Sequence, residues 1–294
     1  MIQKIQMLTI AVVLLFMGYN AQSQDALLWK ISGNGLSEPS YLYGTIHIIC
    51  EKDMVRLDQL EELVKATDQV VLEVDMDAPE TAQKMQMGSL NPGMKNIKEE
   101  LTEKQQDMLN KFLTEKFGAN LDQMGIVKPW ALSVMISTQG VIECADKTAY
   151  ETQLLNFAKS NSKEVLGLET IDFQLNMFES MKREDQIKML TDAVEKKVEY
   201  DELLRKLIKT YQNENIDEIH NMFLETSPEM LKYSDLLLYN RNSNWIAKIG
   251  EYMKEKSTLF AVGAGHLGGE KGVVALLKKA GYNVEAVKQS RTND

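Results

Sequence analysis

A short pattern that occurs twice constrains this chain more than any other feature. Near the start of the sequence Tyr41-Leu42-Tyr43 is followed by Gly44-Thr45-Ile46-His47, and near the end Phe260-Ala261-Val262 is followed by Gly263-Ala264-Gly265-His266. Each time an apolar strand candidate precedes Gly-x-x-His, and an amphipathic helix and a second strand follow. The repeat predicts an α/β fold whose central mixed sheet takes strand–Gly-x-x-His–helix–strand units from both ends of the chain.

Between the two units, the sequence from about residue 97 to 256 has a mostly helical pattern and predicts a large helical insertion. One short strand, 164–166, interrupts it. In the first unit, the apolar run 70–74 predicts a strand that is covered on both faces. Residues 24–294 are therefore expected to form a single domain.

Local signals give more detailed expectations within the insertion. Thr102 and Gln105 form a capping box that starts a helix, and Gly118 is placed to end it. Pro129 suits the first turn of the next helix. The charged, periodic stretch 181–212 predicts one long solvated helix, and 85–94 predicts a connecting loop.

Polar residues stand at or just after the ends of the predicted strands. His47 and His266 follow the two repeated strands, while Glu73 and Glu169 lie near the ends of two others. In open α/β sheets these positions line the ligand crevice. Two imidazoles with one or two carboxylates suit Zn, Mn, Co or Fe, and a bound metal can turn water into a nucleophile. Without a metal, one histidine could serve as the base.

Three further features are ambiguous. Arg241-Asn242 could clamp a substrate carboxylate or pair with Glu169, although a surface arginine is the simpler interpretation. His220 lies on a helix rich in polar residues and is expected to face solvent. Residues 263–268 match the dinucleotide pattern G-x-G-x-x-G, but only 26 residues follow Gly268, too few for a doubly wound sheet.

The N-terminus and the charge balance indicate where the protein works. Lys4, the apolar run 8–17 and Ala21-Gln22-Ser23 predict a signal peptide over residues 1–23. The apolar run is shorter than the roughly 20 residues that a bilayer span needs. We therefore expect export to a periplasm, cell envelope or extracellular space without a stable membrane span, an uncleaved anchor being the alternative. With 43 acidic against 33 basic residues, nucleic acid is not an expected partner.

Export makes a disulfide between Cys50 and Cys144 chemically allowed. The sequence does not show whether the two cysteines are close together. Two buried free thiols are the alternative, and Cys50 could also be a metal ligand because it lies three residues after His47.

Taken together, the motifs resemble the TraB/GumN family, which is related to the Tiki proteins and more distantly to the ChaN and erythromycin-esterase folds. The matching segments, in family order, are 41–47, 71–73, 167–170 with Gln174, 241–242 with Trp245, and 262–269. The resemblance implies an α/β core in which both Gly-x-x-His motifs meet in one cleft. For the Tiki branch it also implies metal-dependent peptide cleavage outside the cytoplasm.

The residues and the resemblance together predict an exported, metal-dependent hydrolase, in the first instance a peptidase acting on a peptide or protein. His47, His266 and Glu73 would hold a divalent Mn, Co or Zn ion, Glu73 as ligand or as base. Glu169, Arg241 and Asn242 would support the site, with Arg241 holding a substrate carboxylate or an oxyanion. The alternatives are a cell-envelope protein that binds a metal, haem or peptide without turnover, and an adaptor in a surface or secretion system.

Overall fold

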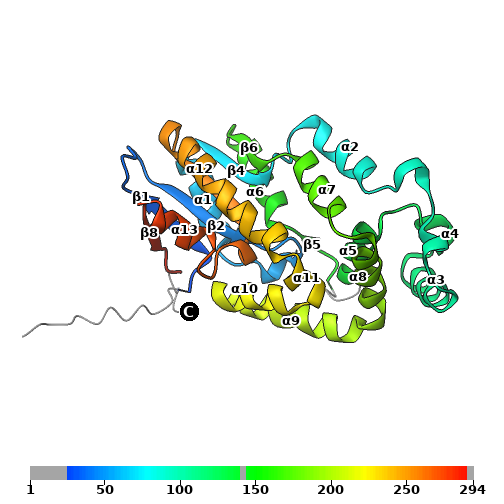
Figure 1. Cartoon of the computed structure of the whole chain (residues 1–294). Helices are drawn as coiled ribbons and strands as arrows, with labels where there is room; N and C mark the ends of the chain where they lie inside the picture. The colour runs from blue at the N-terminus through cyan, green and yellow to red at the C-terminus, as the bar shows by residue number, and fades with distance from the viewer. Residues whose placement is uncertain (1–24, 140–143, 290–294) are drawn as a thin grey trace, which may run out of the picture.

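The computed structural model describes residues 25–139 and 144–289 and has a six-stranded mixed sheet at its centre (Figure 1). The strands of this sheet are β1 (Leu28–Ser32), β2 (Ser40–Thr45), β4 (Gln69–Val74), β6 (Glu164–Glu169), β7 (Thr258–Gly263) and β8 (Asn283–Ala286). Their spatial order is β6-β4-β7-β2-β1-β8, in which β6, β4, β7 and β2 run parallel and β1 runs antiparallel to both of its neighbours. The predicted α/β fold is confirmed.

The two repeated units meet in the middle of this sheet. Strand β2 from the first unit pairs in parallel with β7 from the last, in a register that places Thr45 opposite Gly263. The strands that lead into the two Gly-x-x-His motifs are therefore direct neighbours. Strand β4 lies on the other side of β7, and β6, from within the predicted insertion, adds the edge strand beyond β4.

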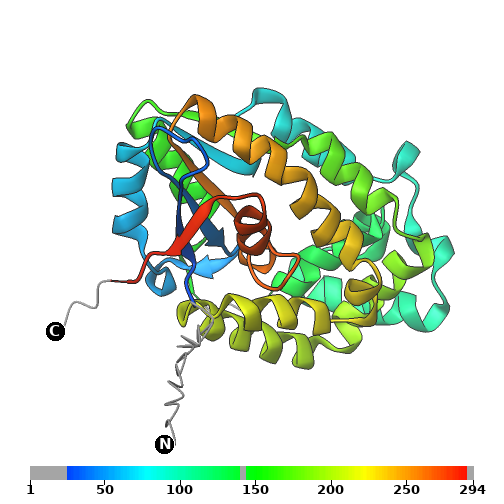
Figure 2. The ribbon, with the colours of Figure 1, turned by 60° about the vertical axis from the view of Figure 1, so that its left-hand side comes forward.

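Helices cover both faces of the sheet (Figure 2). On one face α1 (Leu57–Ala66) packs beside α6 (Tyr150–Ser160), and on the other α12 (Asn240–Glu255) packs beside α13 (Val273–Lys279). Tyr43 of β2 stacks obliquely on Tyr150 of α6, with ring centroids 5.3 Å apart, whereas Phe260 of β7 contacts Tyr252 of α12 at 6.4 Å. The apolar strands are thus buried on both sides, as expected for the run 70–74.

Most of the remaining helices extend away from the sheet (Figure 1), although two of them also contribute Tyr211, Ile216 and Ile219 to the core beside it. The remaining helices are α2 (Pro79–Gly88), α3 (Glu103–Phe117), α4 (Leu121–Met124), α5 (Pro129–Thr138), α7 (Ile171–Glu179), α8 (Arg183–Glu195), α9 (Lys197–Gln212), α10 (Ile216–Glu225) and α11 (Pro228–Lys232). Helices α3, α4, α5 and α8 share an apolar core of their own, which includes Leu109, Leu132 and Leu190.

Several local expectations are confirmed. The Thr102 side chain accepts a hydrogen bond from the backbone N–H of Gln105, whose side chain in turn accepts one from the Thr102 N–H. Helix α3 ends at Gly118, which adopts a left-handed φ of 65° that suits glycine. Pro129 occupies the first turn of α5.

Two expectations were wrong. Residues 85–94 are not all loop, because α2 continues to Gly88, where an added Cβ would lie 2.4 Å from the Leu175 side chain. Glycine at this position permits close packing of α2 on α7 and does not mark a loop. The stretch 181–212 is two helices that meet at Lys196, since α8 buries Leu190 in the helical core while α9 carries Tyr211 toward the sheet.

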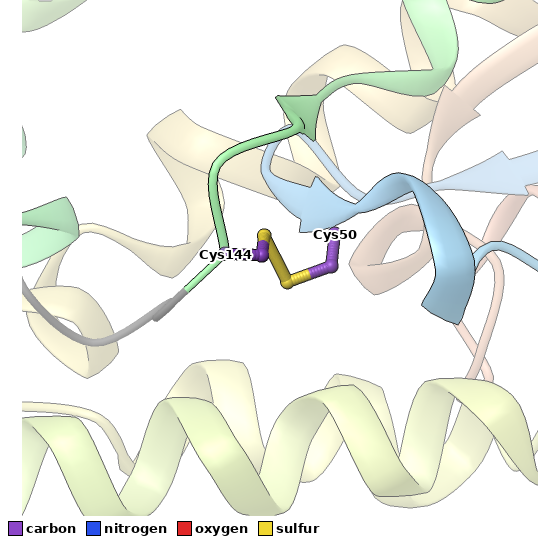
Figure 3. The surroundings of a disulfide bond; sticks show 2 residues. All are labelled: Cys50 and Cys144. Carbon is purple, nitrogen blue, oxygen red and sulfur yellow. A yellow bond between two sulfur atoms is a disulfide. The ribbon is translucent and has the colours of Figure 1, made fainter.

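Two short strands and a disulfide close the region between β2 and α6. Strand β3 (Ile49–Cys50) pairs with β5 (Lys147–Thr148), and Cys50 is joined to Cys144 (Figure 3). Of the alternatives that the sequence left open, the structure shows the disulfide. The bond ties the segment just after His47 to the segment just before α6.

The predicted signal peptide, 1–23, lies outside the described residues. Within the described ranges, no helix combines the length and the apolar character needed to cross a bilayer.

Loss of the disulfide should lower the free energy of unfolding by about 4 kcal/mol. The reason is that the bond joins residues 94 positions apart and so strongly restricts the unfolded chain. Urea unfolding of Cys50→Ser/Cys144→Ser against the oxidised parent measures the difference. Thiol titration of the denatured, unreduced parent should detect no free cysteine. Reactive thiols in that titration would contradict the pairing.

Candidate functional site

The four parallel strands bring the predicted site residues to one edge of the sheet. Glu73 is the second-last residue of β4 and Glu169 is the last of β6. His47 follows β2 by two residues, and His266 ends a single helical turn, Ala264–His266, directly after β7. Because β6, β4, β7 and β2 are parallel neighbours, their carboxyl ends form one continuous rim. The repeated motifs therefore do meet.

Gly263 is the point around which three of these side chains converge. A Cβ added to this glycine would lie 3.3 Å from Oε1 of Glu73, 3.7 Å from Nε2 of His47 and 3.7 Å from Cδ2 of His266. The backbone N–H of Gly263 also donates to Oε1 of Glu73 over 2.8 Å. Glycine keeps open a small space between the two imidazoles and the carboxylate.

A buried ion cluster connects three of the strand ends. The Arg241 side chain donates from Nη2 to Oε2 of Glu73 over 2.5 Å and from Nε to Oε1 of Glu169 over 3.0 Å. Trp245, one turn further along α12, donates to the same Glu169 oxygen over 2.9 Å and stacks its ring against the guanidinium. Gln174 of α7 donates to both carboxylates. Arginine suits this role because its planar fork can serve several acceptors at once.

These charges keep the cluster ionised although it is buried. Burial alone would raise the pKa of Glu73, but the positive charge of Arg241, with smaller contributions from the two histidines and the Gly263 N–H, holds that pKa well below its usual range. Burial opposes the charge of Arg241 too, yet the two carboxylates raise its pKa. Glu73 and Arg241 are therefore charged at every physiological pH.

His266 is buried and neutral. Its Nε2 lies 3.0 Å from Nη1 of Arg241, and its Nδ1 lies 2.5 Å from Oδ1 of Asn242. Since a guanidinium nitrogen can only donate, Nε2 must accept, and the ring proton sits on Nδ1 and is donated to Asn242. Burial and the charge of Arg241 lower the pKa of His266 to about 3, against the opposing effect of Glu73.

His47 is the accessible member of the site: 70% of its side chain is exposed, and it also lines a cavity. Its Nδ1 lies 3.0 Å from Oε1 of Glu151, an oxygen that also accepts from the Thr45 hydroxyl over 2.7 Å. The surrounding protein atoms alone would lower the pKa of His47. The hydrogen bond and charge of Glu151, together with the charge of Glu73, raise it to about 9. Its Nε2 is directed toward the space beside Gly263.

The family model for the TraB/PrgY/gumN family matches residues 27–286, most of the chain. The chain belongs to this family. The resemblance predicted from the motifs is thereby confirmed. Comparisons with curated proteins and with solved structures gave no match. Membership of the TraB/PrgY/gumN family does not by itself specify a reaction, which has to be argued from the site.

A divalent ion held by His47, Glu73 and His266, as predicted from the residues and the family resemblance, does not fit this arrangement. Both ring nitrogens of His266 are engaged, and both oxygens of Glu73 accept hydrogen bonds from the protein. Arg241 takes the place between Glu73 and His266 that such an ion would need. Across the described residues, no group of three His, Cys, Asp or Glu side chains is arranged to hold a metal ion. The chemistry of the site is therefore derived from the chain's own groups.

Arg241 also has no nitrogen left over for a substrate carboxylate. Its Nε, Nη1 and Nη2 all donate to protein acceptors, among them the carbonyl of Leu237. Of the interpretations weighed for this arginine, the structure shows pairing with Glu169, and the simpler interpretation of a surface arginine was wrong because Arg241 is buried. Asn242 is fully buried and fixes the His266 ring, while its Nδ2 donates to the Lys271 carbonyl.

Glu151 is the site residue that the sequence did not indicate. It lies in the first turn of α6, where an acidic residue is ordinary because it complements the helix dipole. It reaches His47 only because β3, β5 and the disulfide bring that turn beside the end of β2. The sequence contains no local signal of this contact.

His220 was wrongly expected to face solvent. It is only 5% exposed, because it shares the buried face of α10 with Ile216, Ile219 and Met222. Its Nδ1 lies 2.9 Å from the carbonyl oxygen of Gly265 and its Nε2 lies 3.2 Å from the Tyr239 hydroxyl. His220 thus supports the loop that carries His266.

The glycine-rich segment 263–268 also serves close packing. An added Cβ at Gly268 would lie 2.4 Å from the backbone oxygen of Ile216, so α10 approaches the loop at a distance that only glycine allows. The glycines that match the dinucleotide pattern are therefore explained by this packing and by the contact of Gly263 with Glu73.

Arg241→Met should lower the free energy of unfolding by about 3–5 kcal/mol, because it leaves buried carboxylates without their counter-charge. Arg241→Lys should restore little of the loss, since one ammonium group cannot reach all the acceptors. Urea unfolding at pH 7 measures both. The triple variant Arg241→Met/Glu73→Gln/Glu169→Gln should recover part of the stability, and a single variant as stable as the parent would contradict the assignment.

The two site histidines should titrate far apart in NMR spectra of the folded protein, His47 near pH 9 and His266 near pH 3. Single-site variants assign the signals. Between pH 6.5 and 3 the unfolded chain binds a proton at position 266 that the folded chain does not. The free energy of unfolding should therefore fall as the pH decreases through that window. Titration of both rings near pH 6.5 would contradict the geometry.

Proposed function

We propose that this protein hydrolyses an ester or amide bond, with His47 as the group that transfers protons. A peptide bond in an exported peptide or protein is the first substrate class to test. The observation that carries the proposal is that the two ring nitrogens of His47 have different surroundings. Nδ1 contacts Glu151, while Nε2 faces an open space. Two adjacent groups, the charged Glu73 and the neutral His266, complete that space.

The hydrogen bond to Glu151 fixes the tautomer of the neutral ring. With the proton on Nδ1, the lone pair of Nε2 points toward the cavity, as a general base oriented by a carboxylate requires. A water molecule beside Nε2 gives its proton to the ring while its oxygen bonds to the substrate carbonyl carbon. The imidazolium then returns the proton to the departing nitrogen or oxygen as the carbon–heteroatom bond breaks.

The buried cluster supports this chemistry by electrostatics. Glu73 is kept charged by Arg241 and stands next to His47, so it stabilises the imidazolium that forms when the ring takes up a proton. Glu169 accepts hydrogen bonds from both Arg241 and Trp245, so Arg241 is fixed in position. Its ion pair with Glu73 therefore holds the Glu73 side chain beside His47. These buried residues thus act on the pKa of His47 without touching the reacting atoms.

We further propose that the protein acts outside the cytoplasm, in a periplasm, cell envelope or extracellular space. The disulfide between Cys50 and Cys144 supports this location, because such bonds persist in oxidising compartments. It also helps to hold the His47–Glu151 pair in place, so the oxidised form is the one to assay.

With a pKa near 9, only about one His47 ring in a hundred is in the basic form at pH 7. The value of kcat/KM should therefore rise about tenfold per pH unit up to a plateau near pH 9. His47→Ala should reduce kcat/KM at least about 100-fold. Glu151→Gln should move the rising limb to lower pH, since it removes the carboxylate that raises the pKa of His47. Cleavage of a quenched fluorescent peptide library measures these effects.

Glu103→Gln is the matched control, because Glu103 is an exposed residue in the first turn of α3, far from the site. It should leave the pH profile unchanged. Cleavage should persist in the presence of a chelator. Activity that appears only after a divalent metal is added would contradict the proposed role of His47 and would require Arg241 to leave His266 and Glu73.

Capture of a peptide without turnover is the second candidate function. It is favoured by the same high pKa, because a His47 that stays protonated at neutral pH donates hydrogen bonds and does not accept a proton from water. Retention of library peptides without any product up to pH 9 would support capture over hydrolysis.

A further inference from the structure

The candidate site opens into a large apolar cavity of about 450 Å³. Charged and polar groups of the candidate site, among them His47, Glu73 and Arg241, form one part of its lining. The rest of the wall is mostly apolar and includes an unusual number of methionines. These are Met177, Met181, Met189, Met222 and Met230.

Such a space is not ordinary core. Protein interiors are close-packed and contain few voids larger than a water molecule, whereas ligand pockets measure roughly 300–1,000 Å³. The methionines come from α7 with the turn that follows it, and from α8, α10 and α11, so four segments contribute to one apolar wall. The helical part of the molecule thus leaves its apolar side chains facing a space that joins the site.

The electrostatics of the cavity indicate what can occupy it. Apart from Glu73 and Arg241 of the candidate site, no Asp, Glu, Lys or Arg side chain of the described residues lines the cavity. The charge of Arg241 is already offset by Glu73 and Glu169. A charged group would therefore lose hydration against the apolar wall and find no partner there. Methionine side chains are flexible and polarisable, which suits an occupant whose shape varies.

We propose that this cavity binds a long, uncharged apolar chain that the substrate carries next to the bond presented to His47. The substrate class is then an ester or amide with a fatty acyl chain or successive apolar peptide side chains on one side of the bond. Both sources share the same chemistry, a flexible apolar group attached to a carbonyl. The bond that is broken rests on the proposed function, whereas the binding of the apolar chain does not.

Binding can be measured without turnover in His47→Ala, with the neutral fluorophore N-phenyl-1-naphthylamine as the probe. We expect saturable one-to-one binding with increased emission. Met189→Gln/Met230→Gln should weaken it about tenfold, because the amides keep the side-chain size but cost desolvation. Met189→Leu/Met230→Leu should retain binding within about threefold, since it conserves apolar volume. Both variants change partly exposed positions, and their melting curves report folding.

Met87→Gln is the matched control, because Met87 is 59% exposed on α2 and does not line the cavity. Displacement of the probe by methyl octanoate supports an acyl chain as the occupant, and displacement by N-acetyl-Leu-Leu-amide supports peptide side chains. The inference is overturned if the probe does not saturate, if neither competitor displaces it, or if Met87→Gln weakens binding as much as the double glutamine variant. Probe binding and displacement in a parent protein that cleaves nothing would defeat the proposed hydrolysis and leave this inference standing.

Discussion

The site depends on the buried ion pairs that Arg241 forms with Glu73 and Glu169. Arg241 is only 6% exposed, and its guanidinium joins Glu73 from β4, Glu169 from β6 and the ring of His266 after β7. Burying charges is costly, and the cost is offset only while each charge keeps its partners. The same contacts that hold three neighbouring strand ends together also decide that Glu73 is charged and that His266 is neutral.

The site therefore has a rigid half and an accessible half. His266 is locked between Arg241 and Asn242, so it has no free nitrogen to offer a ligand. His47 is exposed, contacts Glu151 through one nitrogen and leaves the other for the cavity. The repeated motif thus supplies two histidines with different tasks. In this arrangement a positive side chain of the protein stands where a metal ion was expected, and the proton chemistry falls to His47.

Much of this could be predicted from the sequence because it depends on local patterns. An apolar run that ends in Gly-x-x-His forms a strand followed by a turn, whatever its position in the sheet. Parallel strands then bring their carboxyl ends to one rim. The contacts of Glu151 and His220 could not be predicted in the same way. Glu151 reaches His47 across more than a hundred residues, and His220 is buried by packing of α10 on the glycine loop.

The sequence by itself determined the strands, the turns and which polar residues stand at the ends of the sheet, since periodicity and glycine placement act over a few residues. Only the tertiary structure decided what those residues can do. Protonation depends on burial and on charges that arrive from distant segments, as the opposite pKa shifts of His47 and His266 show. The same is true of the methionine-lined cavity, because its wall exists only when four segments of the chain pack around one space.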